Sequence, residues 1–108
     1  RSGALSASIA AGDKTVETIV REAARHIGRA VAGVVHLLAP DRVVLGGGLV
    51  EAMTDLFVEE VRGSAKRRVL PSFADSFDVV AAKLGDDAGV MGAAAWAQKQ
   101  VEAEAKIN

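Results

Sequence analysis

The stretch Arg42-Val43-Val44-Leu45-Gly46-Gly47-Gly48 decides the fold that this sequence predicts. Residues 42–45 form a short apolar run rich in valine, which is typical of a fully buried strand and too short to predict a helix. The three glycines that follow end the strand and allow a sharp turn toward the next element. In open parallel sheets, ligands bind beyond the carboxyl ends of the strands. Residues 46–48 are therefore the first candidate site.

Helical periodicity lies on both sides of this strand. After a short helix at residues 5–11, Asp13 is suited to cap a long helix that ends before Pro40. The apolar stripe expected to pack consists of Val16, Ile19, Val20, Ala23, Ile27, Ala30, Val31, Val34, Val35 and Leu38. A second helix is expected from about residue 53 to 68. Its apolar side would carry Met53, Leu56, Phe57, Val61 and Ala65.

A second buried strand is expected over residues 77–83, and a last helix runs from Asp86 to about residue 103. The expected order is helix, strand, helix, strand, helix. Two strands joined through a helix form a right-handed parallel crossover, which predicts an α/β fold. Two strands are too few for a complete sheet of that kind. We therefore expect residues 1–108 to be a single unit cut from a longer chain.

Composition narrows the functional classes. The 108 residues include 13 Lys plus Arg and 14 Asp plus Glu, for a formal charge of −1, which disfavours nucleic acid as the main partner. The chain has no Cys, so a disulfide framework, a thiolate zinc site and a cysteine nucleophile are excluded. The longest apolar stretch is about ten residues, short of the roughly 20 that cross a bilayer. No secretory signal is expected, and cytoplasm is the default location.

Two features can carry chemistry, and each has a plain structural alternative. The glycine triplet lets a flat ring or a phosphate approach the main chain, or it is only a tight turn. The pair Asp86 and Asp87 can act as general acid and base or hold a metal. Alternatively, these acids stabilise the start of the last helix through its dipole and free amides.

Other polar residues favour structural roles. His26 and His36 lie about 15 Å apart along one helix, so they cannot share a metal. A basic cluster, Arg62, Lys66, Arg67 and Arg68, is expected at a solvated helix end. No Ser, His and Asp triad is indicated.

Two segments taken together resemble the C-terminal part of the ROK family (repressors, open reading frames and sugar kinases). They are Ala39-Pro40-Asp41-Arg42-Val43-Val44-Leu45-Gly46-Gly47-Gly48-Leu49 and Leu84-Gly85-Asp86-Asp87-Ala88-Gly89-Val90-Met91-Gly92-Ala93-Ala94-Ala95. The resemblance runs from about Gly12 to Trp96. It implies a partial ribonuclease H-like lobe, as in the actin, hexokinase and heat-shock ATPase superfamily.

The resemblance also implies roles for residues. Gly46, Gly47 and Gly48 would line the adenine and ribose side of an ATP site. The segment 85–94 would be the second connecting motif, on the helix that hinges two lobes, so that Asp86 and Asp87 become structural or hinge residues. The family's phosphate loop, catalytic aspartate and zinc motif lie upstream of the matched region. This chain is therefore expected to hold no catalytic residue and no metal ligand, and to be inactive alone.

The expected function is that of the C-terminal portion of a glucokinase-like enzyme that uses ATP with magnesium and a small sugar. The alternative is a sugar-sensing ROK transcriptional repressor, in which case nucleic acid would also be a partner. Because strands that should flank the predicted pair are absent, we expect a homodimer. Its buried surface would include the stripe of Ile27, Val31 and Val34 or the helix of Gly92.

Overall fold

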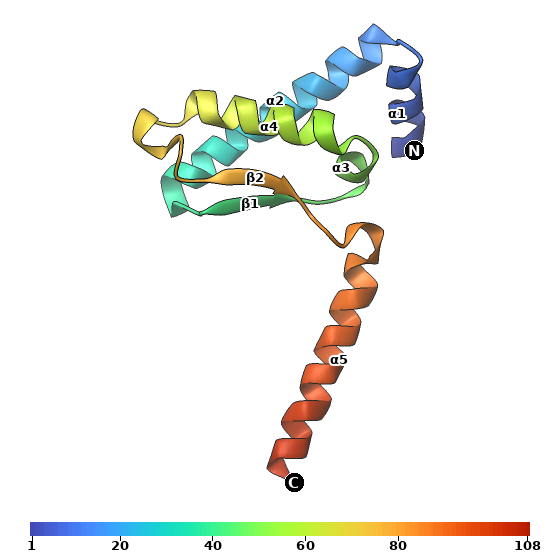
Figure 1. The fold of residues 1–108 in the computed structure, drawn as a ribbon, viewed down its shortest axis with the longest axis vertical. Helices are drawn as coiled ribbons and strands as arrows, with labels where there is room; N and C mark the ends of the chain where they lie inside the picture. Colours follow the sequence, from blue (N-terminus) through green and yellow to red (C-terminus); the bar gives the residue numbers. More distant parts are fainter.

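The computed structural model describes all residues, 1–108. Figure 1 shows two long helices lying over a small sheet and a last helix that runs away from them. The elements are α1 (Ser2–Ala10), α2 (Lys14–Leu38), β1 (Arg42–Leu45), α3 (Gly48–Ala52), α4 (Thr54–Arg68), the 3₁₀ turn η1 (Pro71–Phe73), β2 (Asp78–Ala81), the 3₁₀ turn η2 (Gly85–Asp87) and α5 (Ala88–Ile107). The predicted order is confirmed, and the short α3 is an addition.

The ends of α2 follow from local sequence. The Asp13 carboxylate accepts hydrogen bonds from the backbone N–H groups of Thr15 and Val16, both at 3.1 Å, and so caps the first turn. At the other end Ala39 adopts the left-handed conformation, with φ of 47°, and Pro40 follows it. Both predicted boundaries of the long helix are confirmed.

The core lies between α2 and α4, which pack at close range. The α2 residues buried there are Val20, Ala24, Gly28, Val31, Ala32 and Val35. A Cβ atom on Gly28 would stand 2.5 Å from the Ser64 Cβ, so this glycine sets the closest approach of the two helices. The apolar side predicted for α4 is confirmed, with Phe57, Val61 and Ala65 buried.

The stripe predicted for α2 is wrong in part. Ile19, Val34 and Leu38 are 61%, 43% and 70% exposed. The buried side of α2 instead combines valines with the small residues Ala24, Gly28 and Ala32, which allow the two backbones to approach closely. Val31 is buried within its own chain, so it is not available to the dimer surface expected from the sequence.

The two strands pair in parallel, with Arg42 opposite Asp78 and Leu45 opposite Ala81. Helices cover one face of this sheet, as Figure 1 shows. On that face Val79 is fully buried, whereas Val44 of the other face is 59% exposed. The prediction that residues 42–45 form a fully buried strand is therefore wrong, because no second helical layer lies against them.

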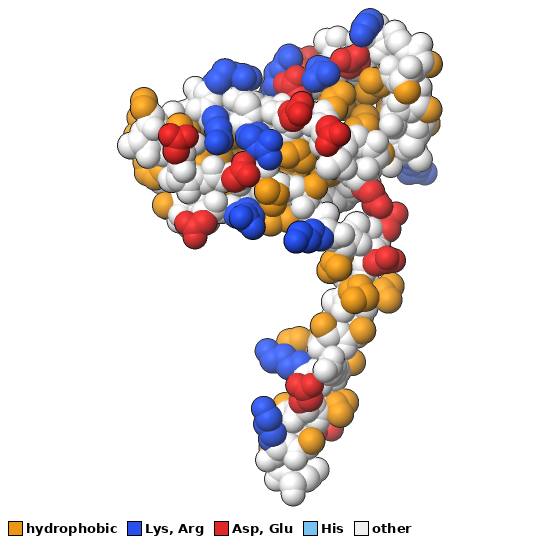
Figure 2. Space-filling model, in the orientation of Figure 1, with side chains coloured by type: hydrophobic (Ala, Val, Ile, Leu, Met, Phe, Trp, Pro, Cys, Tyr) orange, Lys and Arg blue, Asp and Glu red, His pale blue; other side chains and the backbone are white.

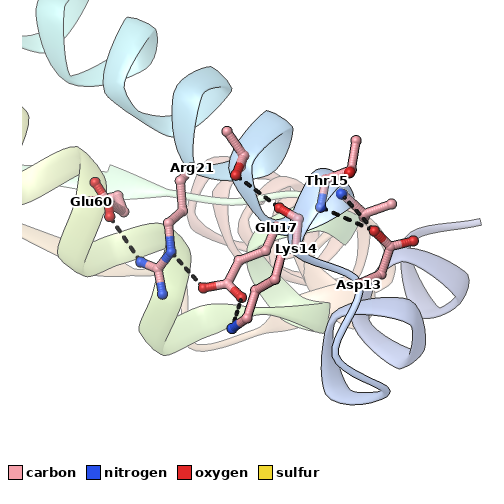
Figure 3. Close-up of polar contacts among 8 residues, drawn as sticks. Asp13, Lys14, Thr15, Glu17, Arg21 and Glu60 are labelled. Carbon is pink, nitrogen blue, oxygen red and sulfur yellow. Dashed lines mark hydrogen bonds and ion pairs between the residues drawn. The ribbon is translucent and has the colours of Figure 1, made fainter.

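A polar network runs along the outer side of α2 and α4 (Figure 3). Arg21 donates to Glu17 at 2.9 Å and to Glu60 at 2.8 Å, and Arg25 donates to Glu60 at 3.1 Å. Hydrogen bonds from Arg21 and Lys14 lower the pKa of Glu17. Burial raises the pKa of Glu60, but its two arginine partners outweigh burial and lower the pKa overall. The network holds the two helices together through ionised groups.

The prediction of a solvated basic cluster at the end of α4 is correct for Arg67 and Arg68, which are exposed, and wrong for Arg62 and Lys66, which are half-buried. Arg62 donates to the Asp78 carboxylate at 2.9 Å and to the Val79 carbonyl. The Lys66 ammonium lies 6.0 Å from the centre of the Phe77 ring. Arg68 donates to the Ser64 hydroxyl at 2.7 Å. These side chains tie α4 to β2 and to the core.

Helix α5 extends away from the rest of the molecule, and all of its residues are exposed. The molecule measures 61 × 39 × 15 Å, and its radius of gyration of 17.8 Å exceeds the ~13 Å of a compact chain of this length. Figure 2 shows apolar side chains along the projecting helix. None of the helices combines the length and the apolar character that spanning a bilayer requires.

Candidate functional site

The glycine triplet forms the turn between β1 and α3 at the carboxyl end of the sheet. Gly47 has φ of 107°, a conformation that side chains rarely allow, and α3 begins at Gly48. All three glycines are exposed. The predicted turn after the first strand is present, while its role in binding stays a prediction.

A cavity of about 270 Å³ opens beside this turn, and we call it the glycine cavity. It collects residues from the carboxyl ends of both strands, from α3 and α4 and from the segment that leads into α5. Its lining consists of Leu45, Gly46, Gly47, Val50, Glu51, Thr54, Ala81, Ala82, Lys83, Gly85 and Ala88. The parallel crossover thus builds the cavity where the topology places ligand sites.

A second hollow of about 290 Å³, the apolar cavity, adjoins the same turn. It shares Leu45, Gly46, Gly47 and Val50 with the glycine cavity and adds Ile27, Gly48, Leu49 and Phe57. The three glycines therefore separate a hollow with charged groups from one lined mainly by hydrocarbon. Such a boundary suits a ligand that has a flat apolar ring joined to polar groups.

Charged groups meet at the rim of the glycine cavity. The Asp86 carboxyl raises the pKa of Glu51, because a hydrogen bond between the two side chains forms only when one of them is protonated and because their negative charges repel each other. The carboxylate of Glu51 also lies against Gly85, where a Cβ atom would stand 3.0 Å from Oε1. Lys83 lines the same cavity. Figure 2 shows acidic side chains gathered where α5 leaves the body of the molecule.

The pair Asp86 and Asp87 does not cap α5 in the way the sequence predicts. Asp87 is the N-cap residue of α5, but no side chain forms a capping hydrogen bond there. The two acids instead lie in η2, which precedes the helix. The chain contains no group of three His, Cys, Asp or Glu side chains placed to hold a metal ion. The acids belong to the junction between β2 and α5.

The two histidines lie outside both cavities. His36 accepts a hydrogen bond through Nε2 from the Leu70 backbone N–H at 3.0 Å, and its ring meets Phe73 edge to face at 5.4 Å. His26 is exposed on α2. The structural role predicted for His36 agrees with these contacts.

Sequence reasoning missed Glu51, Thr54 and Lys83 as cavity residues. Glu51 and Lys83 are polar residues with no motif of their own. One signal was present in the sequence. Glu51 follows Gly48 by three residues, so in a helix that begins at Gly48 the two residues lie on the same face. That helix was not predicted.

Comparisons with known proteins agree on one family. The ROK family model matches residues 3–100. The glucokinase of Thermotoga maritima is 34% identical over 90 residues, which cover 83% of this chain and 28% of that protein. The bifunctional enzyme NanE/NanK of Brucella melitensis is 38% identical over 88 residues, 79% of this chain and 15% of that enzyme. The chain thus spans less than a third of these relatives.

A solved structure shows the same fold. A candidate sugar kinase from Cytophaga hutchinsonii superposes with a TM-score of 0.75 over 90% of this chain and 32% of its own, at 24% sequence identity. The predicted fold class is confirmed: the chain is mixed α/β with a parallel pair of strands, and it shares its fold with part of this solved structure.

Proposed function

The chain belongs to the ROK family, and from this premise we propose that it forms the adenosine side of the ATP cleft of a glucokinase-like sugar kinase. The observation that carries this proposal is the glycine cavity at the carboxyl ends of two parallel strands, beside the turn at Gly47. The names of the relatives support a kinase that acts on a hexose or a related sugar.

The residues present fit an adenosine group. A Cβ atom added at Gly47 would meet nothing within 4 Å, so a ring or ribose can lie against the backbone of this glycine. The Cβ positions of its neighbours are partly covered, by Ala82 at Gly46 and by Ser2 at Gly48. The apolar cavity beside them offers Leu49 and Phe57 to the base. We assign no residue of this chain to magnesium, which ATP carries on its phosphates.

The same proposal gives η2 and α5 the role of a hinge. Helix α5 contacts η2, and η2 lies against α3 of the glycine turn. A change in the direction of α5 would therefore alter the shape of the glycine cavity. Residues 1–108 act in this scheme as one unit, which holds one wall of the cleft and the hinge.

This unit supplies binding and not the chemical step. Phosphoryl transfer needs the phosphates, the metal and the attacking hydroxyl positioned together. The resemblance to the ROK family implies that the residues that activate the sugar hydroxyl lie upstream of the matched region. We therefore expect residues 1–108 alone to bind nucleotide and to transfer no phosphate.

A coupled assay for ADP tests the proposal. The full-length protein is mixed with ATP, magnesium and each of a panel of hexoses, and residues 1–108 serve as the comparison. The kinase assignment predicts sugar-dependent ADP formation by the full-length protein and none by residues 1–108. Binding of a hexose without any ADP formation would contradict the kinase and fit a sugar-sensing repressor.

A further inference from the structure

Three polar side chains line the glycine cavity, and two of them are free to meet a ligand. The Thr54 hydroxyl already donates to the Val50 carbonyl at 2.8 Å. Glu51 and Lys83 form no ion pair within the chain, although they line the same cavity. A ligand in this cavity therefore meets one carboxylate and one ammonium group that the fold itself does not use.

The surroundings of Glu51 decide which part of a nucleotide can approach it. The Glu51 carboxylate lies against Gly85, and the next two residues of η2, Asp86 and Asp87, add negative charge beside this part of the cavity. Phosphate groups are repelled there by charges of the same sign. Ionised carboxylates only accept hydrogen bonds, so they have no donor to offer one another. A neutral ligand group with hydroxyl donors can therefore bind beside them.

On these grounds we propose that Glu51 accepts hydrogen bonds from the 2′- and 3′-hydroxyls of the nucleotide ribose and makes the site selective for ribonucleotides. This inference rests on the proposed function, because it requires the ribose of a bound adenosine group in the glycine cavity. The ribose lies between the base at the glycine turn and the phosphates, which leave on the side of Lys83. Glu51 is then a specificity-determining residue that touches the ligand and takes no part in bond breaking.

The position of Glu51 is suited to this task. It belongs to the first turn of α3, three residues after Gly48, so the turn that admits the nucleotide also fixes the start of the helix that carries the carboxylate. Its side chain is exposed, so that substitution leaves the core intact. Gly85 leaves the carboxylate room, since a Cβ atom there would come within 3.0 Å of it.

Equilibrium titration of the full-length protein with ATP, 2′-deoxy-ATP and 2′,3′-dideoxy-ATP tests this role. The unaltered protein should bind ATP about tenfold more tightly than dideoxy-ATP, the ratio expected for losing hydrogen bonds to a charged acceptor. Glu51→Ala should reduce this ratio to about twofold or less, mainly by weakening ATP. Glu59→Ala, which removes an exposed carboxylate that lines neither cavity, should leave the ratio unchanged.

Each outcome separates the inference from the proposed function. If Glu51→Ala binds ATP and dideoxy-ATP with the same ratio as the unaltered protein, Glu51 does not contact the ribose and the inference is overturned. If the unaltered protein binds none of the three nucleotides, the proposed function fails and the inference fails with it. If Glu51→Ala loses the preference for ATP over dideoxy-ATP while Glu59→Ala keeps it, the result supports both the inference and the proposed function.

The pH dependence of the ratio provides a second readout. Because Asp86 raises the pKa of Glu51, the preference for ATP should weaken in acid as Glu51 is protonated. Asp86→Asn removes the neighbouring charge, so the preference should persist to lower pH in that variant. If the affinity ratio depended on pH in the same way in the unaltered protein and in Asp86→Asn, the assignment of the ionised Glu51 to the ribose would be overturned.

Discussion

At the scale of single residues, Gly28 controls how closely the two long helices pack. Its missing side chain leaves room for the Ser64 side chain and the Val61 carbonyl, and the Ser64 hydroxyl donates to the Arg25 carbonyl at 2.8 Å. Gly28 and Ser64 are far apart in the sequence, so no local pattern could reveal that they meet. Local signals such as Asp13 and Pro40, by contrast, predicted the ends of α2 correctly.

Gly28→Ala should destabilise the protein by about 1–3 kcal/mol, because a methyl group at this position would lie 2.5 Å from the Ser64 Cβ and force the helices apart. Urea denaturation followed by circular dichroism measures the change.

Gly33→Ala is the matched control, since Gly33 lies on the same helix and a Cβ atom added there would meet nothing within 4 Å. This substitution should stabilise the protein by about 0.5–1 kcal/mol through helix propensity alone. Equal effects of the two substitutions would show that Gly28 is not a close-contact position.

At the scale of elements, β2 is shorter than the sequence predicts because a parallel ladder needs a partner. The apolar pattern extends over residues 77–83, but β1 has only four residues, and β2 pairs over the matching four. The helix α3 and the turn η2 were missed because elements of three to five residues carry too few positions for a periodic signal. Two of the elements that line the glycine cavity, α3 and η2, were thus not predicted.

Arg62 and Asp78 join α4 to β2, and this contact depends on pH. A hydrogen bond from the Val79 backbone lowers the pKa of Asp78, and Arg62 lowers it further. A carboxyl group with a lowered pKa in the folded state stabilises the fold above its unfolded pKa. That stabilisation is lost as the pH falls through the ordinary value of 3.8 toward the lower value in the folded protein.

Asp78→Asn should therefore lower stability at neutral pH and make the loss of stability in acid shallower. Urea midpoints measured between about pH 7 and about pH 2.5 give both effects. Asp75→Asn, which changes an exposed aspartate in no ion pair, serves as the control and should follow the unaltered protein. Parallel curves for Asp78→Asn and the unaltered protein would contradict a contribution from the ionised Asp78.

At the scale of the whole molecule, much apolar surface remains uncovered. The exposed apolar residues include Ile27, Val34 and Leu38 of α2, Val44 of the sheet, and Val90, Trp96 and Val101 of α5. The sequence predicted the layered α/β fold and uncovered apolar surface on the helix of Ile27 and Val34 or on that of Gly92, and both helices expose apolar side chains. It did not predict that Val31 is covered while Ile19 and Leu38 are not. Which face of a helix is covered depends on elements that the local sequence does not describe.

Residues 1–108 expressed alone should self-associate, because uncovered apolar patches and an open strand edge favour contact between copies. Light scattering should give a mass that rises with concentration in the micromolar range toward a dimer. The single tryptophan, Trp96, is 63% exposed, so its fluorescence should shift to shorter wavelength if α5 is part of the contact. A constant monomer mass would contradict this prediction.

The central claim is that the turn at Gly47 forms part of an ATP site, and the Gly47→Val substitution tests it most directly. Gly47 has φ of 107°, which valine does not readily adopt, so the turn and the cavity beside it must change. Gly33→Val, at an exposed glycine that lines neither cavity, controls for the added side chain.

The measurement is the KM for ATP of the full-length protein at saturating sugar, with sugar binding determined alongside. We predict that Gly47→Val raises the KM for ATP about tenfold or more, while sugar binding stays nearly unchanged and Gly33→Val behaves like the unaltered protein. An unchanged KM for ATP in Gly47→Val would contradict the assignment of this turn to the nucleotide.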